Sequence, residues 1–338
     1  MKTITIIGGG LAGLALGVGL RRRDVPVRLL EAGTYPRHRV CGEFISGRGL
    51  EALRALGAGD VLQRAATKEA FDVALFSDSR RIAMHHLPSK ALSISRFILD
   101  EALAKTFSDA AGELECGKRW TGEAHEGTVI ATGRRRHTHD HGVRWFGIKV
   151  HARDVSLEAD LEMYLFKDRY VGLCRLADGT VNVCGLFRGT GDANAGDART
   201  RLCGPSHSAL NERLREARFD TDSLCSVAGF SFEQEPFEKR ECRIGDALTM
   251  IPPVTGNGMS IAFESAALAV DPLVDYASGR RTWSETTAGI TAVLSKRLAT
   301  RLFWASAIHR LMFSRWACTG LALARWQPIW RGLFGLTR

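Results

Sequence analysis

The sequence predicts an α/β fold with an α+β insertion and a helical C-terminal segment. Three observations lead to this prediction. A strand, a glycine-rich turn, a helix and a second strand follow one another within residues 3–31, a strand-rich block covers residues 145–187, and residues 286–338 combine arginine with tryptophan. A helix between two neighbouring strands is typical of a parallel sheet, whereas strands in close succession are typical of antiparallel pairing.

The first element is a glycine turn between a strand and a helix. Residues 3–7 form an apolar, β-branched run, residues 8–13 read GGGLAG, and a second apolar run at 27–30 ends at Glu31. Glu31 lies 18 residues after Gly13, close to the spacing of an acid that binds ribose hydroxyls. The pattern predicts a Rossmann-like unit that binds a dinucleotide, with an unliganded glycine turn as the alternative.

Each glycine of the turn has a physical reason. Gly8 permits the sharp turn out of the strand, and Gly10 lets backbone N–H groups approach a pyrophosphate. Gly13 allows the helix to pack closely on the sheet. The N-terminus of the helix then faces the phosphates with its partial positive charge.

Composition places the chain among ordinary globular proteins. The 338 residues are 45% hydrophobic and 25% charged. The eight cysteines include no CxxC pair, so we expect free thiols in a reducing cytoplasm and no zinc or dithiol motif. We expect no signal peptide, because the first strand begins at residue 3.

The charge is unevenly distributed. The formal net charge is +9, and residues 286–338 contain eight Lys or Arg, no Asp or Glu, and four of the seven tryptophans. This composition is typical of a helix at a membrane interface, so peripheral contact through residues 294–338, at the inner face of the membrane, is one interpretation. A helical tail packed on the protein is the other. No apolar run is long enough to span a bilayer, and no nucleic-acid-reading module accompanies the charge.

Hydrophobic periodicity predicts the remaining elements in order. We expect helices at 49–64, 95–107, 208–218 and 258–270, and a hairpin at 71–87. We expect strands at 128–133, 145–150, 161–166, 170–176 and 180–187, and a strand followed by a turn at 243–247. The neighbours His85 and His86 should face opposite sides of their strand, so at most one of them can line a pocket. The histidines within residues 137–141 lack further ligands, and we expect a solvated loop there and no metal.

A second glycine-containing locus follows much later. Residues 245–247 read Gly-Asp-Ala, and a loop that ends in Gly256-Asn257-Gly258-Met259 opens the next helix. Asp246 can accept hydrogen bonds from sugar-alcohol hydroxyls. The loop backbone and the helix N-terminus can stabilise negative charge on a reduced ring. A simple nicotinamide site would not need this second locus.

Together with residues 36–46, Arg96 at the start of a helix and the strand end at 131–133, these motifs resemble FAD-dependent oxidoreductases. The resemblance covers residues 1 to about 270 and points to the group that includes para-hydroxybenzoate hydroxylase and geranylgeranyl reductase. It implies a Rossmann-like FAD-binding domain of the glutathione-reductase type. It also implies that FAD is held by Gly8, Gly10, Leu11, Ala12, Gly13, Glu31, Ala32, Arg39, Cys41, Gly42, Arg96, Asp246, Gly256, Gly258 and Met259.

The resemblance also implies a division into domains. The FAD-binding domain is expected at 1–70, 91–135 and 240–285, a substrate-binding β-sheet domain at 71–90 and 136–239, and a basic, tryptophan-rich tail at 286–338. Cys41 and Glu43 are candidate catalytic residues, Cys41 because members of the geranylgeranyl-reductase side carry Cys-Gly near the flavin. The alternatives are a small buried hydrophobe for Cys41 and a structural carboxylate for Glu43.

Two departures from the family pattern bear on the reaction. Monooxygenases of this group usually carry Ala-Asp-Gly after the strand at 128–133, where this chain has Thr132-Gly133 followed by three arginines. NAD(P)H is therefore expected as a transient electron donor at most, and no second GxGxxG provides a nicotinamide domain. The Trp-x-Trp-x-Ile-Pro motif of flavin halogenases is absent, which argues against halogenation.

The sequence therefore favours a cytoplasmic, geranylgeranyl-reductase-like FAD-dependent oxidoreductase that acts on a hydrophobic small molecule of prenyl, polyketide-like or lipidic type. A monooxygenase that hydroxylates an aromatic substrate is one alternative. A non-catalytic flavoprotein or membrane-surface binding module is the other.

Overall fold

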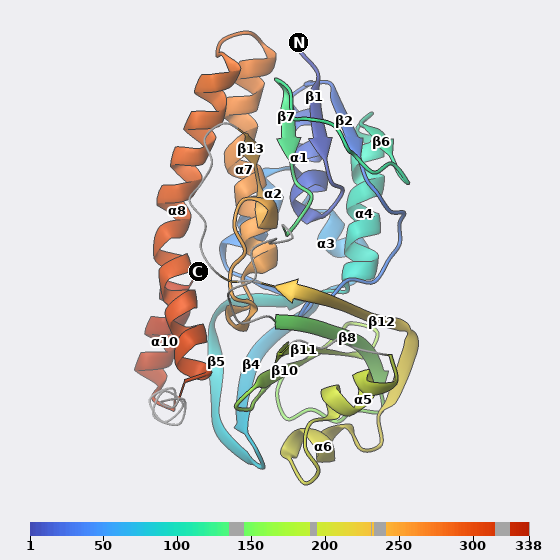
Figure 1. Cartoon of the computed structure of the whole chain (residues 1–338), viewed down its shortest axis with the longest axis vertical. Coiled ribbons are helices and arrows are strands. Elements are labelled where there is room, and N and C mark those ends of the chain that lie inside the picture. Colours follow the sequence, from blue (N-terminus) through green and yellow to red (C-terminus); the bar gives the residue numbers. More distant parts are fainter. Residues whose placement is uncertain (135–144, 190–194, 231, 233–240, 315–324, 338) are drawn as a thin grey trace.

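Two β-sheets and the helices around them make up the fold (Figure 1). The computed structural model describes residues 1–134, 145–189, 195–230, 232, 241–314 and 325–337. Five strands form the first sheet in the order β13-β7-β1-β2-β6, and eight form the second in the order β12-β8-β11-β10-β9-β4-β5-β3. The prediction of an α/β fold with an inserted sheet is confirmed.

The first sheet is parallel throughout. Its strands are β1 (Ile4–Ile7), β2 (Val27–Leu30), β6 (Glu113–Glu115), β7 (Thr128–Ile130) and β13 (Cys242–Arg243). β1 lies in the middle of the sheet, between β2 and β7, and its side chains are almost wholly buried. The carboxyl end of the central strand therefore leads directly into the glycine turn, which is where such sheets bind ligands.

Helices cover this sheet and share one apolar core with it. They are α1 (Leu11–Arg21), α2 (Arg48–Ala55), α3 (Val61–Arg64), α4 (Arg96–Asp109) and α7 (Gly258–Ala277). Close packing depends on small residues: a Cβ on Gly17 of α1 would lie 2.8 Å from the ring of Phe107 on α4. The expectation of one helix at 49–64 is wrong, because Gly57 adopts a positive φ of 74° and separates α2 from α3.

The second sheet is antiparallel except for the parallel pair β4–β9. Its strands are β3 (Phe44–Ser46), β4 (Lys68–Ser77), β5 (Arg80–Ser93), β8 (Trp145–Arg153), β9 (Leu161–Leu165), β10 (Arg169–Arg175), β11 (Val181–Arg188) and β12 (Arg218–Phe230). The predicted hairpin at 71–87 is longer than expected, and β3 pairs with β5 although it lies within the expected FAD-binding segment.

The two faces of β8 have different surroundings. Phe146, Ile148 and Val150 belong to the core that the second sheet shares with α5 (Ala195–Cys203) and α6 (Ala209–Leu214). The alternate residues, among them Lys149, project from the opposite face. The helix predicted at 208–218 is shorter than expected, because Arg218 already begins β12.

The described residues of the C-terminal part include the helices α8 (Trp283–Met312) and α10 (Gln327–Leu336). Thr282 and Glu285 form a reciprocal capping box at the start of α8, so this helix begins three residues before the expected tail. In Figure 1, α8 runs beside α7 on the left, and α10 lies next to β5. Within the described part of the chain, no helix combines the length and apolar character that crossing a bilayer requires.

Candidate flavin and substrate site

A cavity of about 1020 Å³ is lined by residues from both sheets and from α8 and α10. Every residue that the resemblance assigned to FAD lines it, with the exception of Gly13. Segments from positions 8, 31, 39–42, 96, 246 and 256–259 therefore meet at one place. We call these segments the cradle, because a long nucleotide cofactor is expected to lie across them.

The glycine turn leaves room where a cofactor needs it. A Cβ on Gly8 would lie 2.4 Å from the carbonyl oxygen of Ala131, and a Cβ on Gly13 would lie 2.0 Å from that of Gly8. Gly13 thus acts through packing and not as part of the cavity wall. A Cβ on Gly10 would meet no atom within 4 Å, so the backbone there borders open cavity. These residues fit a bound pyrophosphate.

Glu31 is a buried carboxylate with fixed partners. Its Oε2 accepts the N–H of Gly9 at 2.8 Å and its Oε1 accepts that of Gly33 at 2.7 Å, while Arg37 forms an ion pair at 2.7 Å. Burial alone would raise the pKa of Glu31, but the Gly33 N–H and the Arg37 guanidinium hold that pKa below its ordinary value. The ionised carboxylate is a suitable acceptor for ribose hydroxyls.

Asp246 lines the cavity from the turn Gly245–Ala247, which follows β13. A Cβ on Gly245 would approach that of Ala12 to 2.9 Å, so this turn packs directly on α1. Burial raises the pKa of Asp246 to about 6, although Arg96 acts in the lowering direction. Its side chain is accessible from the cavity, which suits a hydrogen-bond acceptor for sugar-alcohol hydroxyls.

Two cavity arginines are held by one buried acid. Asp100 accepts the Nε and Nη2 of Arg96 at 2.7 and 2.9 Å, and the Nε of Arg39 at 3.0 Å. The Asp100 side chain is completely buried. It holds two guanidinium groups beside the cradle, where they can neutralise phosphate charge. Nothing in the sequence pattern singled out Asp100.

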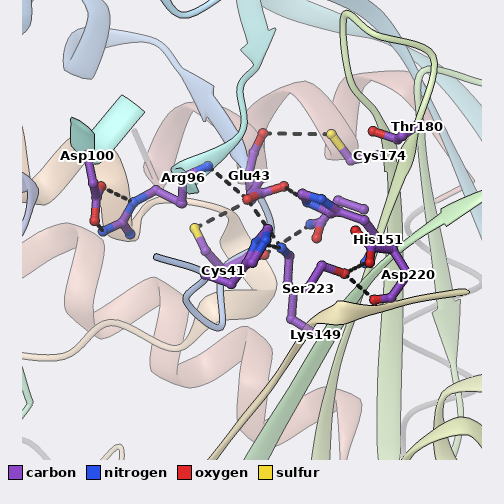
Figure 2. Close-up of polar contacts among 12 residues, drawn as sticks. Cys41, Glu43, Arg96, Asp100, Lys149, His151, Cys174, Thr180, Asp220 and Ser223 are labelled. Atoms are coloured by element: carbon purple, nitrogen blue, oxygen red, sulfur yellow. Dashed lines mark hydrogen bonds and ion pairs between the residues drawn. The ribbon is translucent and has the colours of Figure 1, made fainter. Parts of the chain in front are cut away.

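Glu43 does not line the cavity, and Figure 2 shows it among the side chains of Cys41, Arg96 and His151. One carboxylate oxygen accepts the backbone N–H of Arg96 at 2.8 Å, and the other lies 2.7 Å from Nε2 of His151. Lys149 Nζ is 3.7 Å from the first oxygen. Glu43 also has a positive φ of 54°, which is uncommon for a residue with a side chain. The contacts tie the Cys41–Glu43 segment to β8 and α4.

Cys41 lines the cavity, and its sulfur accepts the N–H of Glu43 at 3.4 Å. Burial raises the pKa of the Cys41 thiol, with Arg96 acting in the opposite direction. Cys41 is therefore a neutral thiol at ordinary pH, which can contact a substrate but is a weak nucleophile. The seven described cysteines, Cys318 not being among them, form no disulfide.

Away from the cradle, the cavity wall is apolar. The second sheet contributes mainly aliphatic side chains, namely Val73, Leu75, Leu87, Leu161, Met163, Leu165 and Leu186. α8 and α10 contribute Trp304, Ile308, Leu311, Met312, Trp330, Leu333 and Phe334. Polar side chains in this region include Tyr170 and Ser226, and burial keeps the pKa of the Tyr170 hydroxyl well above the ordinary value.

The contact of α10 with β5 closes one side of this apolar region. His85 is 4% exposed, contacts Gln327 and stacks on Trp330 with ring centroids 5.1 Å apart. His86 points to solvent with 83% of its side chain exposed. The opposite orientation of the two histidines is confirmed, and neither of them lines the cavity.

The sequence reasoning missed several residues at the site. Lys149 and His151 carried no motif, and His38 lay within the quoted segment 36–46 without a role assigned to it. An isolated lysine within an apolar strand is nevertheless a usable signal of an interior polar contact. Arg134 lines the cavity and donates to the carbonyl of Ala228, whereas Arg135, Arg136 and residues 137–141 lie outside the described residues. In the part that the structure describes, no cluster of three His, Cys, Asp or Glu could hold a metal ion.

Comparison with known proteins agrees with this geometry. Residues 1–144 match the family model described as FAD binding domain. A 60-residue segment is 42% identical to a squalene epoxidase of Aspergillus fumigatus, and one of the same length is 38% identical to that of Schizosaccharomyces pombe. Each segment is 18% of this chain, and they span 12% and 13% of those proteins.

Solved structures resemble the chain over nearly its whole length. The flavin-dependent brominase Bmp2 has a TM-score of 0.77 at 16% identity, with 99% of this chain and 92% of that chain covered. A flavoprotein/dehydrogenase from Cytophaga hutchinsonii has 0.79 at 13%, with 100% and 92% covered. PqsL of P. aeruginosa has 0.71 at 14%, with 95% and 99% covered. At these identities the likeness establishes the fold.

The family match and the fold define a protein that contains an FAD-binding domain over residues 1–144, next to a second, mostly antiparallel sheet.

Proposed function

We propose that this protein is an FAD-dependent monooxygenase that acts on a hydrophobic small molecule of prenyl, polyketide-like or lipidic type. The apolar composition of the cavity beyond the cradle carries the proposal, because a buried apolar wall gains free energy by excluding water from a similarly apolar ligand. The short matches to squalene epoxidases support the oxygen-using reaction.

Each part of the chain has a role in this proposal. The residues assigned to FAD hold the cofactor, which when bound and reduced supplies the electrons for oxygen chemistry. One oxygen atom of O₂ enters the substrate, and the other leaves as water after two electrons and two protons are taken up. The apolar wall orients the substrate. The cavity-lining side chains of α8 and α10, which we call the roof, keep bulk water out. NAD(P)H is proposed as a transient donor of electrons.

The expected division of labour follows from the same arrangement. We propose residues 1–70, 91–135 and 240–285 as the FAD-binding part and residues 71–90 and 136–239 as the substrate-binding part. The short strand β3 connects the two parts. It pairs with β5 in the second sheet, while Cys41 and Gly42, just before it in the sequence, line the cradle. Residues 286–338 add the roof.

Reduction of a double bond, as in geranylgeranyl reductase, is the second candidate. The neutral Cys41 thiol at the cavity wall favours it, because a thiol can donate a proton to a substrate carbon after hydride transfer. In this reaction the substrate takes up a hydride and a proton, and no oxygen is consumed.

Anaerobic reduction of the bound flavin with dithionite separates the candidates without a nicotinamide donor. A prenyl alcohol, a polyene and a phenol are then added first without oxygen and next with ¹⁸O₂. The monooxygenase proposal predicts no re-oxidation until oxygen is admitted, and then a product that contains ¹⁸O. Anaerobic re-oxidation with a saturated product would establish the reductase instead. Flavin that responds to none of the compounds would favour a non-catalytic flavoprotein.

We also propose peripheral membrane contact through α8 and α10. Phe303 of α8, Leu336 of α10 and Trp326 just before α10 are exposed, and Arg310, Arg325 and Arg331 are exposed near them in the sequence. Apolar and basic side chains together suit an anionic lipid surface. Flotation with anionic vesicles should fall when Arg310 and Arg331 become Glu, and vesicles of neutral lipid serve as the control. Unchanged flotation would refute the contact.

A further inference from the structure

A buried charged cluster lies behind the cavity wall at β8. Lys149 is completely buried, and its Nζ is 3.1 Å from Nδ1 of His38 and 3.7 Å from Oε1 of Glu43. Lys149 also lies in register between Cys184 of β11 and Cys225 of β12, both of which line the cavity. His38 lines the cavity, whereas Lys149 and Glu43 do not. The cluster therefore reaches the cavity through His38.

The short contact determines where the proton of His38 lies. A lysine ammonium has three donors and no acceptor, so the Nδ1 that faces it must accept and cannot carry a hydrogen. A neutral imidazole with a bare Nδ1 carries its proton on Nε2. The Glu43 carboxylate stabilises the ammonium form of Lys149, and Glu43 is itself anchored by the Arg96 N–H and His151.

The orientation of the His38 ring is also fixed. It stacks on Phe97 with ring centroids 4.4 Å apart and meets the edge of His151 at 5.2 Å. Burial, followed by Lys149 and His151, lowers the pKa of His38 to about 4, against the raising effects of Glu43 and Asp220. The ring is therefore neutral near pH 7. Among the described residues Nε2 has no hydrogen-bond partner, and it remains available to a molecule in the cavity.

We propose that Lys149 is a positioning residue that holds His38 as a neutral N–H donor toward the molecule bound in the cavity. The Nε2–H of His38 would then bond an acceptor oxygen or nitrogen of that molecule. Without the ammonium, the ring could exchange its two neutral tautomers or take up a second proton, and the donor would no longer be defined. The consequence for catalysis rests on the proposed function, whereas the state of the ring does not.

NMR of the ¹⁵N-histidine-labelled apoprotein tests the state of the ring directly. The His38 signal is assigned by its loss in His38→Gln. We expect Nε2 protonated, Nδ1 bare, and titration near pH 4 in the wild type. Lys149→Met should raise the titration midpoint by about one unit or more and mix the tautomers. Lys149→Arg, which keeps a cation, and Lys90→Met, at an exposed position of β5, should leave the signal near that of the wild type.

Two results would overturn the proposal. One is a wild-type ring that is protonated on Nδ1 or titrates near pH 6.5. The other is an unchanged ring in a folded Lys149→Met protein, with folding checked by circular dichroism. If Lys149→Met does not fold, the tautomer of His38 in the wild-type protein still tests the proposal.

A second experiment concerns catalysis once a substrate is found. The acid limb of the kcat/KM profile should move from about pH 4 toward 6.5 in Lys149→Met, because protonation of His38 would then begin at higher pH. A limb that stays in place would refute the catalytic consequence. If no substrate is found, the proposed function fails, but the NMR experiment still tests the state of His38. The failure of the proposed function and the failure of the His38 proposal are therefore distinguishable.

Discussion

Arg301 of α8 and Glu264 of α7 form a buried two-pronged ion pair. Nη1 and Nη2 of the arginine donate to Oε1 and Oε2 of the glutamate at 2.7 and 2.8 Å, and the side chains are 3% and 6% exposed. An arginine of the basic tail that suggested a membrane-facing charge is therefore an internal link. It fixes the helix that bears the apolar roof to the helix that begins at the cradle.

Removal of one partner should be costly. Arg301→Ala leaves the Glu264 carboxylate buried without its guanidinium, and we expect a loss of about 3–5 kcal/mol in the free energy of unfolding. Urea denaturation of the apoprotein measures it. Arg310→Ala, at an exposed position of the same helix, should change the value by less than about 0.5 kcal/mol. Equal effects of the two variants would contradict the assigned role of the pair.

Gly13 should tolerate no side chain. Its Cβ would lie 2.0 Å from the carbonyl oxygen of Gly8, so in Gly13→Ala the turn must move away from α1. We expect a loss of about 1–3 kcal/mol in stability and FAD affinity at least tenfold weaker, measured by fluorescence titration. Gly289→Ala in α8 is the matched control, because its nearest neighbour would be 3.7 Å away, and alanine should stabilise that helix. Unaltered FAD binding in Gly13→Ala would be inconsistent with the close packing.

Asp246 should make the apoprotein less stable as the pH rises. Its pKa is about 6 in the folded chain and about 3.9 when unfolded, so the folded state binds the proton more tightly. The resulting stabilisation is present below pH 4 and is lost as the pH rises through 6. Asp246→Asn should therefore stabilise the apoprotein more at pH 7.5 than at pH 4.5, while it weakens FAD binding. Equal effects at the two pH values would refute the shifted pKa.

His309 should have the opposite pH dependence. Burial among Trp145, Phe232 and Phe313 lowers its pKa to about 4, and its buried Nδ1 has no partner among the described residues. Neutral His309 therefore contributes to the free energy of unfolding above pH 6.5. This contribution, about 2–3 kcal/mol, is lost as the pH falls from 6.5 through 4.

The variant His309→Leu should remove most of this acid sensitivity, as measured by unfolding at pH 4.5 and pH 7. The exposed His86→Leu should keep it. A wild-type slope that persists in His309→Leu would assign the sensitivity to another group.

Tight turns in which there is no room for a Cβ were predictable from the sequence. Gly8 and Gly13 are required by distances of 2.0–2.4 Å to neighbouring carbonyl oxygens, and such positions leave a glycine pattern that can be read directly. Glu31 follows the first glycine turn at a characteristic spacing, and Asp246 lies within a Gly-Asp-Ala turn of its own, so both residues could be identified from the sequence.

Features that depend on long-range docking were not predictable. Lys149 meets His38 across 111 positions, and Arg301 meets Glu264 because two helices happen to cross there. β12 was missed because its pairing with β8 shifts register between Asp220 and Cys225, and because its Asp and Ser residues are uncommon in strands. Neither property produces an alternating pattern.

The position of α10 has a consequence for biosynthesis. All segments of the cradle, from Gly8 to Met259, leave the ribosome before α10 does, and the two main apolar cores contain no residue of that helix. A nascent chain can therefore fold and take up its nucleotide while the cavity is still open. Under the proposed function, proteolytic loss of α10 after folding would leave a folded protein with bound flavin in an open cavity. Its reduced flavin would then react with O₂ without oxygenating a substrate and would release peroxide.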